Sequence, residues 1–298
     1  MEVGGKPGRV TIAAAIALMC LIWGSTWLVI KEGLHDLPTF SSAAYRFTIA
    51  AAIFVVIAPW LHRRERGERP PLRLALTTGI CNFAVSYGIV YWAETVIPSG
   101  LASVLWGVFP MMMALAGHVV LPGERVDPRS FVGFAVGLVG VVVLFATDLR
   151  AIGPDAIGKG AVLLLSPLIA TIGQVITKRD GARVSASLLN RDAMIIGAAL
   201  LWIFAAIVES PLEVVWTRRA LLSVGYLATM GTVVGFGLYY WILRWIPSNR
   251  LSLIAYVTPA LALWLGWVVE DEALKASTIG GTLLVLGGIA LVVRARRS

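Results

Sequence analysis

The feature that most constrains this chain is a succession of long apolar stretches separated by short polar connections. A stretch such as 131–144 is apolar on every side, and a helix needs about 20 apolar residues to cross a bilayer. We therefore predict an all-α, polytopic membrane protein with ten transmembrane helices. Their expected positions are residues 10–31, 40–61, 73–92, 98–120, 130–147, 159–177, 184–208, 220–243, 249–269 and 275–293.

Composition excludes the soluble and barrel alternatives. Hydrophobic residues make up 58% of the 298 residues and charged residues 14%, whereas soluble proteins average about 45–50% and about 25%. An outer-membrane barrel would alternate apolar and polar positions, which these stretches do not.

The sequence holds no phosphate-binding loop, metal-ligand cluster or nucleophile with its base. Cys20 and Cys81 lie inside apolar stretches and form no disulfide pattern. We expect no enzyme activity, no cofactor and no metal.

The first apolar stretch could instead be a cleaved signal, because Lys6 and Arg9 precede it and Cys20 has a place like that in a lipoprotein processing site. Met19 is too large for the small residue that such processing requires. The stretch also exceeds the roughly 7–15 apolar residues of a signal core. We therefore keep it as the first transmembrane helix.

Basic residues are distributed unevenly between the two sets of connections. The net charge is +8, but the basic residues are spread over short connections, so we expect no nucleic acid partner. Seventeen of the 25 lie on the side of the two termini and six on the other, while Arg46 and Arg191 lie inside apolar segments. The positive-inside rule then places both termini in the cytoplasm. The basic segment 62–73 fits this orientation, and contact with anionic lipid is its alternative role.

The second half of the chain repeats the first. At an offset of 149 residues, Tyr91-Trp92 aligns with Tyr240-Trp241 and Ile97-Pro98-Ser99 with Ile246-Pro247-Ser248, among ten identities in thirty positions. Arg46 aligns with Arg191 at an offset of 145. We predict two domains, 1–148 and 149–298, of five helices each. Because five is odd, the second must enter the membrane inverted relative to the first.

Inverted repeats favour transport. Two nearly equivalent halves can exchange an outward-open for an inward-open arrangement around a shared site near the midplane of the membrane. We therefore predict a secondary transporter that works by alternating access on a small-molecule substrate, within the lipid bilayer. A membrane scaffold or an integral enzyme without transport is the alternative.

Several motifs carry a resemblance to a known family. Residues 23–31 (Trp-Gly-Ser-Thr-Trp-Leu-Val-Ile-Lys), Tyr45-Arg46-Phe47, the region 93–110 and Gly123-Glu124-Arg125 resemble EamA-type members of the drug/metabolite transporter superfamily. The likeness covers essentially the whole chain. It implies a ten-helix metabolite exporter of the bacterial cytoplasmic (inner) membrane, similar to the YddG-like aromatic amino acid exporters, with amino acids as expected substrates. Nucleosides, sugars or drugs are the alternative substrates.

Two prolines repeat at mid-membrane depth. Pro110 and Pro259 each follow a helix-starting proline by twelve residues, about 18 Å along a helix. Each removes a hydrogen bond to the carbonyl four residues earlier, that of Trp106 or Ala255. A freed carbonyl must face protein or water. We predict helix kinks that shape the substrate pathway, and a role in packing alone is the alternative.

Aromatic and neutral polar side chains within the segments are the candidate substrate contacts. Aromatic rings stack on flat apolar groups and hold cations over their faces, while Asn, Gln and Ser can bond either to substrate or to another helix. Trp60 lies near a helix end and is expected in the interfacial belt. The candidates are Asn82, Ser86, Tyr87, Tyr91, Trp106, Gln174, Tyr239 and Tyr256.

Four charged residues are candidates for a gate or a charge-binding site. Arg46, Arg191 and Asp192 lie at the start of predicted helices and Glu94 near the end of one. Charges there are costly unless paired or wet, so the arginines could bind a carboxylate, or they could simply extend to the interface. For proton coupling, which is possible, Glu94 or Asp192 would be the first candidates.

Glycines in the fifth and tenth segments allow close approach of helices. Gly133, Gly137 and Gly140 mark one and Gly280, Gly281, Gly287 and Gly288 the other. The two segments could pack on each other within one molecule or between copies, so we expect either a monomer or a homodimer.

Overall fold

The computed structural model describes residues 8–65, 67–121, 126–128, 130–210, 214–243 and 254–295. In these ranges the regular structure is helical apart from one isolated bridge between Glu68 and Val184. Eight helices are long and apolar enough to cross a membrane, and two shorter apolar helices, Val257–Val269 and Ala276–Leu291, complete the set of ten. The predicted all-α membrane fold is confirmed.

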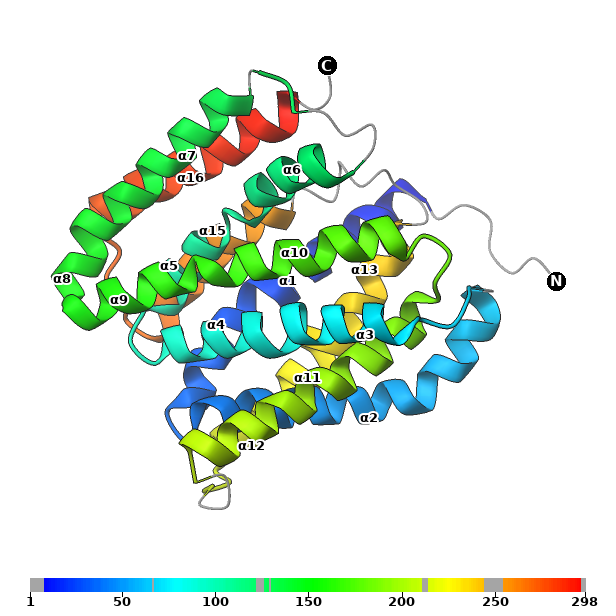
Figure 1. Ribbon diagram of the computed structural model, residues 1–298. Helices are drawn as coiled ribbons and strands as arrows, with labels where there is room; N and C mark the ends of the chain where they lie inside the picture. The colour runs from blue at the N-terminus through cyan, green and yellow to red at the C-terminus, as the bar shows by residue number, and fades with distance from the viewer. Residues whose placement is uncertain are drawn as a thin grey trace.

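The spans follow one another as an up-and-down series (Figure 1). The first five are α1 (Arg9–Leu34), α2 (Thr39–Glu65), α3 (Leu72–Thr78) continued by η1 (Gly79–Val85) and α4 (Ser86–Glu94), α5 (Ser99–Trp106) with α6 (Phe109–Val120), and α7 (Ser130–Leu144) with η2 (Phe145–Leu149) and α8 (Arg150–Ile152). The second five are α9 (Pro154–Leu163) with α10 (Leu165–Asp180), α11 (Ala186–Val208), α12 (Arg218–Tyr226) with η3 (Leu227–Val234) and α13 (Gly235–Leu243), α15 (Ile254–Val269), and α16 (Ala276–Ala295).

The two sides of the membrane can be named from the chain. We call the side on which α1 begins and α16 ends the terminal side, and the opposite side, where the connections after α1, α4, α8, α11 and α15 lie, the far side (Figure 1). The two sides of the bundle differ in their polar contacts, and these differences bear on the site.

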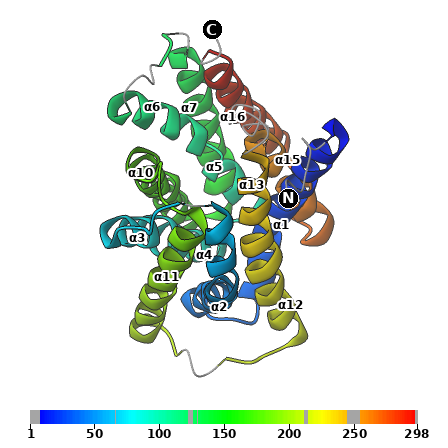
Figure 2. The same ribbon diagram turned by 90° about the vertical axis from the view of Figure 1, so that its right-hand side faces the viewer.

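Helices that correspond in the two halves pack against each other. The most extensive contacts join α2 to α11 and α7 to α16, and Figure 2 shows these pairs at opposite ends of the molecule, with the remaining spans between them. A Cβ on Gly140 would lie 2.7 Å from the carbonyl oxygen of Gly281, and one on Gly288 would lie 2.6 Å from the backbone nitrogen of Gly137. Gly137, Gly140, Gly281 and Gly288 therefore serve packing between α7 and α16 within one molecule, whereas Gly280 and Gly287 face open space.

The outer surface is apolar and the interior mixes apolar with polar groups. Large apolar side chains such as Val56, Leu138 and Ile207 are exposed, as expected where a bilayer replaces water. Phe47, Leu105 and Leu144 are fully buried in the main core. A set of buried polar side chains lies in the same interior, and these define the candidate site.

Several spans depart from regular α-helix, among them the third, fourth, fifth and eighth. The third and eighth each contain a π-helical segment, η1 and η3, at positions that the repeat places in correspondence. Such segments alter the backbone hydrogen bonds and often mark functional sites. The fourth span is interrupted between Trp106 and Phe109, just before Pro110. Its counterpart Pro259 lies inside α15, which continues as one helix.

Candidate functional site

A buried arginine lies at the contact between the two halves. Arg46 of α2 is 1% exposed, so it does not extend to the interface. Its Nε donates a hydrogen bond to Thr232 Oγ1 of η3 over 3.0 Å, and its guanidinium carbon lies 4.7 Å from the centre of the Tyr87 ring. Its Nη1 has no hydrogen-bond partner among the described residues. A buried cation that keeps an unused hydrogen-bond donor is costly in a membrane, which favours a functional role.

Two more unpartnered polar groups follow along α4. Tyr91 and Glu94 are each 0% exposed, and neither the tyrosine hydroxyl nor the two carboxyl oxygens of Glu94 have a hydrogen-bond partner in the described part of the chain. The ammonium of Lys31 donates instead to the backbone carbonyl of Glu94 over 2.7 Å. Arg46, Tyr91 and Glu94 thus form a buried polar strip with unused hydrogen-bonding capacity.

A second polar cluster joins three spans near the interruption of the fourth. The hydroxyls of Ser86 and Ser166 lie 2.8 Å apart, and the indole nitrogen of Trp106 donates to Ser166 Oγ over 3.0 Å. The Trp106 ring stacks on Phe109, with 4.9 Å between centroids, and lies 6.2 Å from Trp27 of α1. Ser166 was not among the site residues predicted from the sequence.

A series of aromatic rings connects α13, α1, η1 and α2. Neighbouring centroids in the series Tyr239, Trp23, Phe236, Phe83, Phe47 and Tyr87 are 4.9 to 6.1 Å apart. Tyr87 and Tyr239 were predicted from the sequence, while Trp23, Phe83 and Phe236 were not chosen. The Trp-Gly-Ser-Thr-Trp motif contains Trp23 and Trp27 and was the available signal for both.

The remaining candidates have diverse surroundings. Asn82 is buried and packs against Gly173 of α10, and its Oδ1 lacks a hydrogen-bond partner in the described ranges. Gln174 is exposed. Arg191 and Asp192 form an ion pair of 2.7 Å and are both partly exposed. The side chain of Tyr256 and the Gly123-Glu124-Arg125 motif lie outside the described residues.

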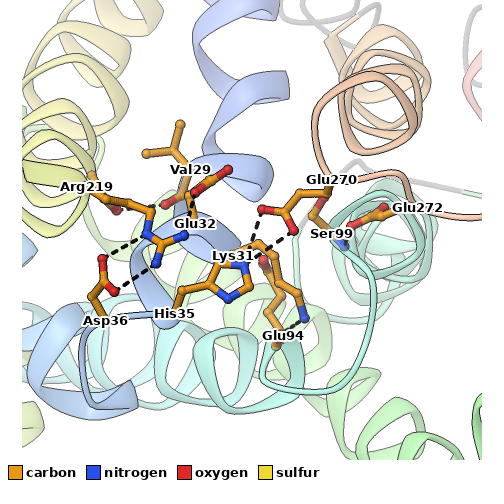
Figure 3. Close-up of polar contacts among 11 residues, drawn as sticks. Val29, Lys31, Glu32, His35, Asp36, Glu94, Ser99, Arg219, Glu270 and Glu272 are labelled. Carbon is orange, nitrogen blue, oxygen red and sulfur yellow. Dashed lines mark hydrogen bonds and ion pairs between the residues drawn. The ribbon is translucent and has the colours of Figure 1, made fainter.

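On the far side, a polar network joins α1, α12 and the connection after α15 (Figure 3). Arg219 of α12 bonds to both carboxyl oxygens of Asp36 over 2.8 Å and lies 3.7 Å from Glu32 of α1. His35 lies 3.4 Å from Glu270, in the connection after α15. Hydrogen bonds from Arg219 and then Thr217 hold the pKa of Asp36 well below its usual range, so this link persists at neutral and mildly acidic pH.

Glutamates at the ends of spans cap the first turns of other helices. On the far side, Glu272 accepts from the backbone nitrogens of Ser99 and Gly100 at 2.5 and 3.0 Å, and Glu209 accepts from those of Phe40 and Ser41 at 2.8 and 2.9 Å. On the terminal side, Glu65 accepts from both the hydroxyl and the backbone nitrogen of Ser187. A carboxylate at a helix N-terminus satisfies free N–H groups and the helix dipole. Glu65 and Glu209 therefore join α2 and α11 reciprocally at their two ends.

These features define a class of protein. Two inverted five-helix halves that meet at buried polar and aromatic groups are the architecture of a membrane transporter. The sequence pattern of the EamA-like transporter family matches the chain twice, over residues 10–146 and 159–294. The chain belongs to the EamA-like transporter family, which is not an enzyme family.

Several relatives share almost the whole length. The chain is 25% identical to "Uncharacterized transporter YoaV" of Bacillus subtilis, over 94% of this chain and 96% of the relative. It is 28% identical to "Uncharacterized inner membrane transporter YedA" of Escherichia coli, over 88% and 83%, and 26% identical to the "Probable amino-acid metabolite efflux pump" of Escherichia coli, over 93% and 92%. A crystal structure with 24% identity, covering 97% of this chain and 99% of the other, has the same fold, with a TM-score of 0.68.

Proposed function

We propose that this transporter exports small metabolites, above all amino acids including aromatic and apolar ones, by alternating access around the interior polar site. The observation that carries the proposal is Arg46, a buried guanidinium that has an unpartnered Nη1 and contacts both halves of the repeat. A guanidinium binds a carboxylate strongly in a dry site. The neighbouring Tyr87 ring and the aromatic series offer surfaces for an apolar side chain.

The transport cycle follows from the contrast between the membrane sides. The far-side network of α1, α12 and the connection after α15 must open to release substrate on that side (Figure 3). The matched pairs α2–α11 and α7–α16 supply a frame around which the remaining spans move. In alternating access, a site between inverted repeats is exposed first to one side of the membrane and then to the other.

The direction of export rests on the orientation. The excess of basic residues on the terminal side favours a cytoplasmic position for both termini, which would make the far side the outer one. The name of the YedA relative supports the inner membrane. We expect a reporter enzyme that works only in the cytoplasm to be active when it is fused after Ser298. Activity of a reporter that works only in the periplasm would instead reverse the proposed direction of transport.

Amino acids as substrates are supported by the Arg46 site and by the name of the efflux pump relative. Purified protein in liposomes should show saturable flux of radiolabelled phenylalanine, and other amino acids should compete for it. Protein-free liposomes are the control. Saturable flux of nucleosides, sugars or drugs in the absence of amino acid flux would replace the substrate class. The absence of saturable flux across a broad metabolite panel would support a scaffold without transport.

A further inference from the structure

Glu94 differs from the other glutamates at the ends of spans. Glu65, Glu209 and Glu272 each accept hydrogen bonds from the start of another helix. Glu94 is more deeply buried than any of them, at 0% exposure, and both of its carboxyl oxygens lack a hydrogen-bond partner among the described residues. A structural carboxyl group in the interior is normally satisfied. The position of Glu94 therefore favours a function that capping does not explain.

The charged surroundings of Glu94 come from several elements. The charged groups that act on its carboxyl are Lys31 of α1, Arg46 of α2 and Glu272 in the connection after α15, and Tyr91 lies one turn earlier on α4. The Lys31 ammonium bonds to the carbonyl of Glu94 and leaves the carboxyl oxygens unpartnered. Two cations and one anion thus act on a carboxyl group whose oxygens have no hydrogen-bond partner among the described residues.

Glu94 also lies between the interior site and the far-side closure. It is the last residue of α4, one turn beyond Tyr91 and two turns beyond Tyr87, which contacts Arg46. Lys31 connects it to α1, whose end carries the residues of the far-side network, Glu32 and His35 (Figure 3). An ionisable group in a membrane at such a point is well placed to serve an ion pathway.

We propose that Glu94 is a proton-exchange site, at which the carboxyl group holds a proton in one part of the cycle and the ammonium group of the substrate in another. This inference rests on the proposed function and adds its coupling. With the terminal side open, the substrate ammonium displaces the proton to the cytoplasm while Arg46 binds the substrate carboxylate. With the far side open, an external proton binds to the carboxylate again and the substrate is released on that side. One proton enters for each zwitterion exported.

The decisive experiment compares Glu94→Gln with Asp192→Asn in liposomes that contain a pH-sensitive dye. Asp192 is the matched control because it is a carboxylate near the start of a span that is partly exposed and paired with Arg191. In the wild type and in Asp192→Asn, labelled phenylalanine should accumulate in liposomes that are more acidic inside than outside, while protons leave the liposomes down their own gradient. In Glu94→Gln, gradient-driven accumulation and proton movement should fall at least about tenfold, and the weaker exchange of labelled for unlabelled phenylalanine that remains should no longer depend on pH. Full gradient-driven accumulation in Glu94→Gln would overturn the inference.

An infrared titration separates this inference from the proposed function. The purified wild type and Asp192→Asn should show a protonated-carboxyl band that changes with pH and is absent from Glu94→Gln. The conservative variant Glu94→Asp keeps a carboxyl group and should retain such a band. It keeps the test possible if the Glu94→Gln protein fails to fold. If no phenylalanine flux occurs but the band behaves as stated, the substrate is wrong and the proton site stands. If the band is the same in Glu94→Gln as in the wild type, the proton site is wrong.

Discussion

Arg46 and Arg191 occupy corresponding positions in the two halves, and their surroundings differ. Both lie in the N-terminal thirds of α2 and α11, which pack on each other and are capped reciprocally by Glu209 and Glu65. Arg46 is buried over an aromatic ring with an unpartnered Nη1, whereas Arg191 is partly exposed and paired with Asp192. The duplication has kept the scaffold symmetric while the two halves have acquired different chemistry. Matched substitutions at related positions can therefore separate scaffold from function.

The largest expected effect is at the arginine pair itself. Arg46→Gln should lower phenylalanine flux at least about 30-fold, because removing one partner of a buried charge interaction costs roughly 2 kcal/mol or more. Arg191→Gln should change flux less than about twofold, since a partly exposed ion pair contributes about 0–1 kcal/mol. Initial rates in liposomes at equal protein content measure both. Arg46→Lys, which keeps the charge, is the additional variant if Arg46→Gln does not assemble.

A smaller effect is expected at a pair of tryptophans. Trp106→Ala should reduce flux about tenfold, because it removes both the ring surface and the bond to Ser166. Trp60→Ala should leave flux nearly unchanged, since Trp60 is 54% exposed and its ring lies under Arg64. Both proteins should elute as the wild type does from size exclusion. Equal flux in the two variants would contradict the aromatic site.

The smallest effect on transport is expected at the reciprocal caps, where the two halves should behave alike. Glu65→Gln and Glu209→Gln each weaken the hydrogen bonds at the start of a partner helix, at a cost of about 1 kcal/mol in stability. Thermal unfolding in detergent should show similar decreases in the unfolding temperature of the two variants. Phenylalanine flux should be reduced less than about twofold in each. A large decrease for only one would indicate that the scaffold is as asymmetric as the site.

Much of the fold could be predicted from the sequence, because its signals are local. Long apolar stretches fix the spans and their number, and the repeated Tyr-Trp and Ile-Pro-Ser segments fix the duplication. The odd number of helices in each half then requires the inversion. The π-helical segments in the third and eighth spans could not be predicted, because they depend on packing between helices and have no sequence pattern comparable to that of proline.

The site was less predictable because burial depends on neighbours from other spans. Arg191 is followed in the sequence by its partner Asp192, but only the approach of Thr232 and Tyr87 from other spans makes Arg46 a buried group. Ser166 is an ordinary helix residue in the sequence, and its role follows from its contact with Trp106. Tyr87 and Trp106, in contrast, were predicted as candidates because aromatic residues away from helix ends are uncommon choices for an interfacial belt.

The most direct test is a cryo-EM map of the protein with saturating phenylalanine. The site predicts ligand density between the two halves, with the carboxylate about 3 Å from Nη1 of Arg46 and the ring against the aromatic side chains near Tyr87. Density that lies at Arg191, or elsewhere with Arg46 still unpartnered, would contradict the assignment of Arg46 as the substrate anchor.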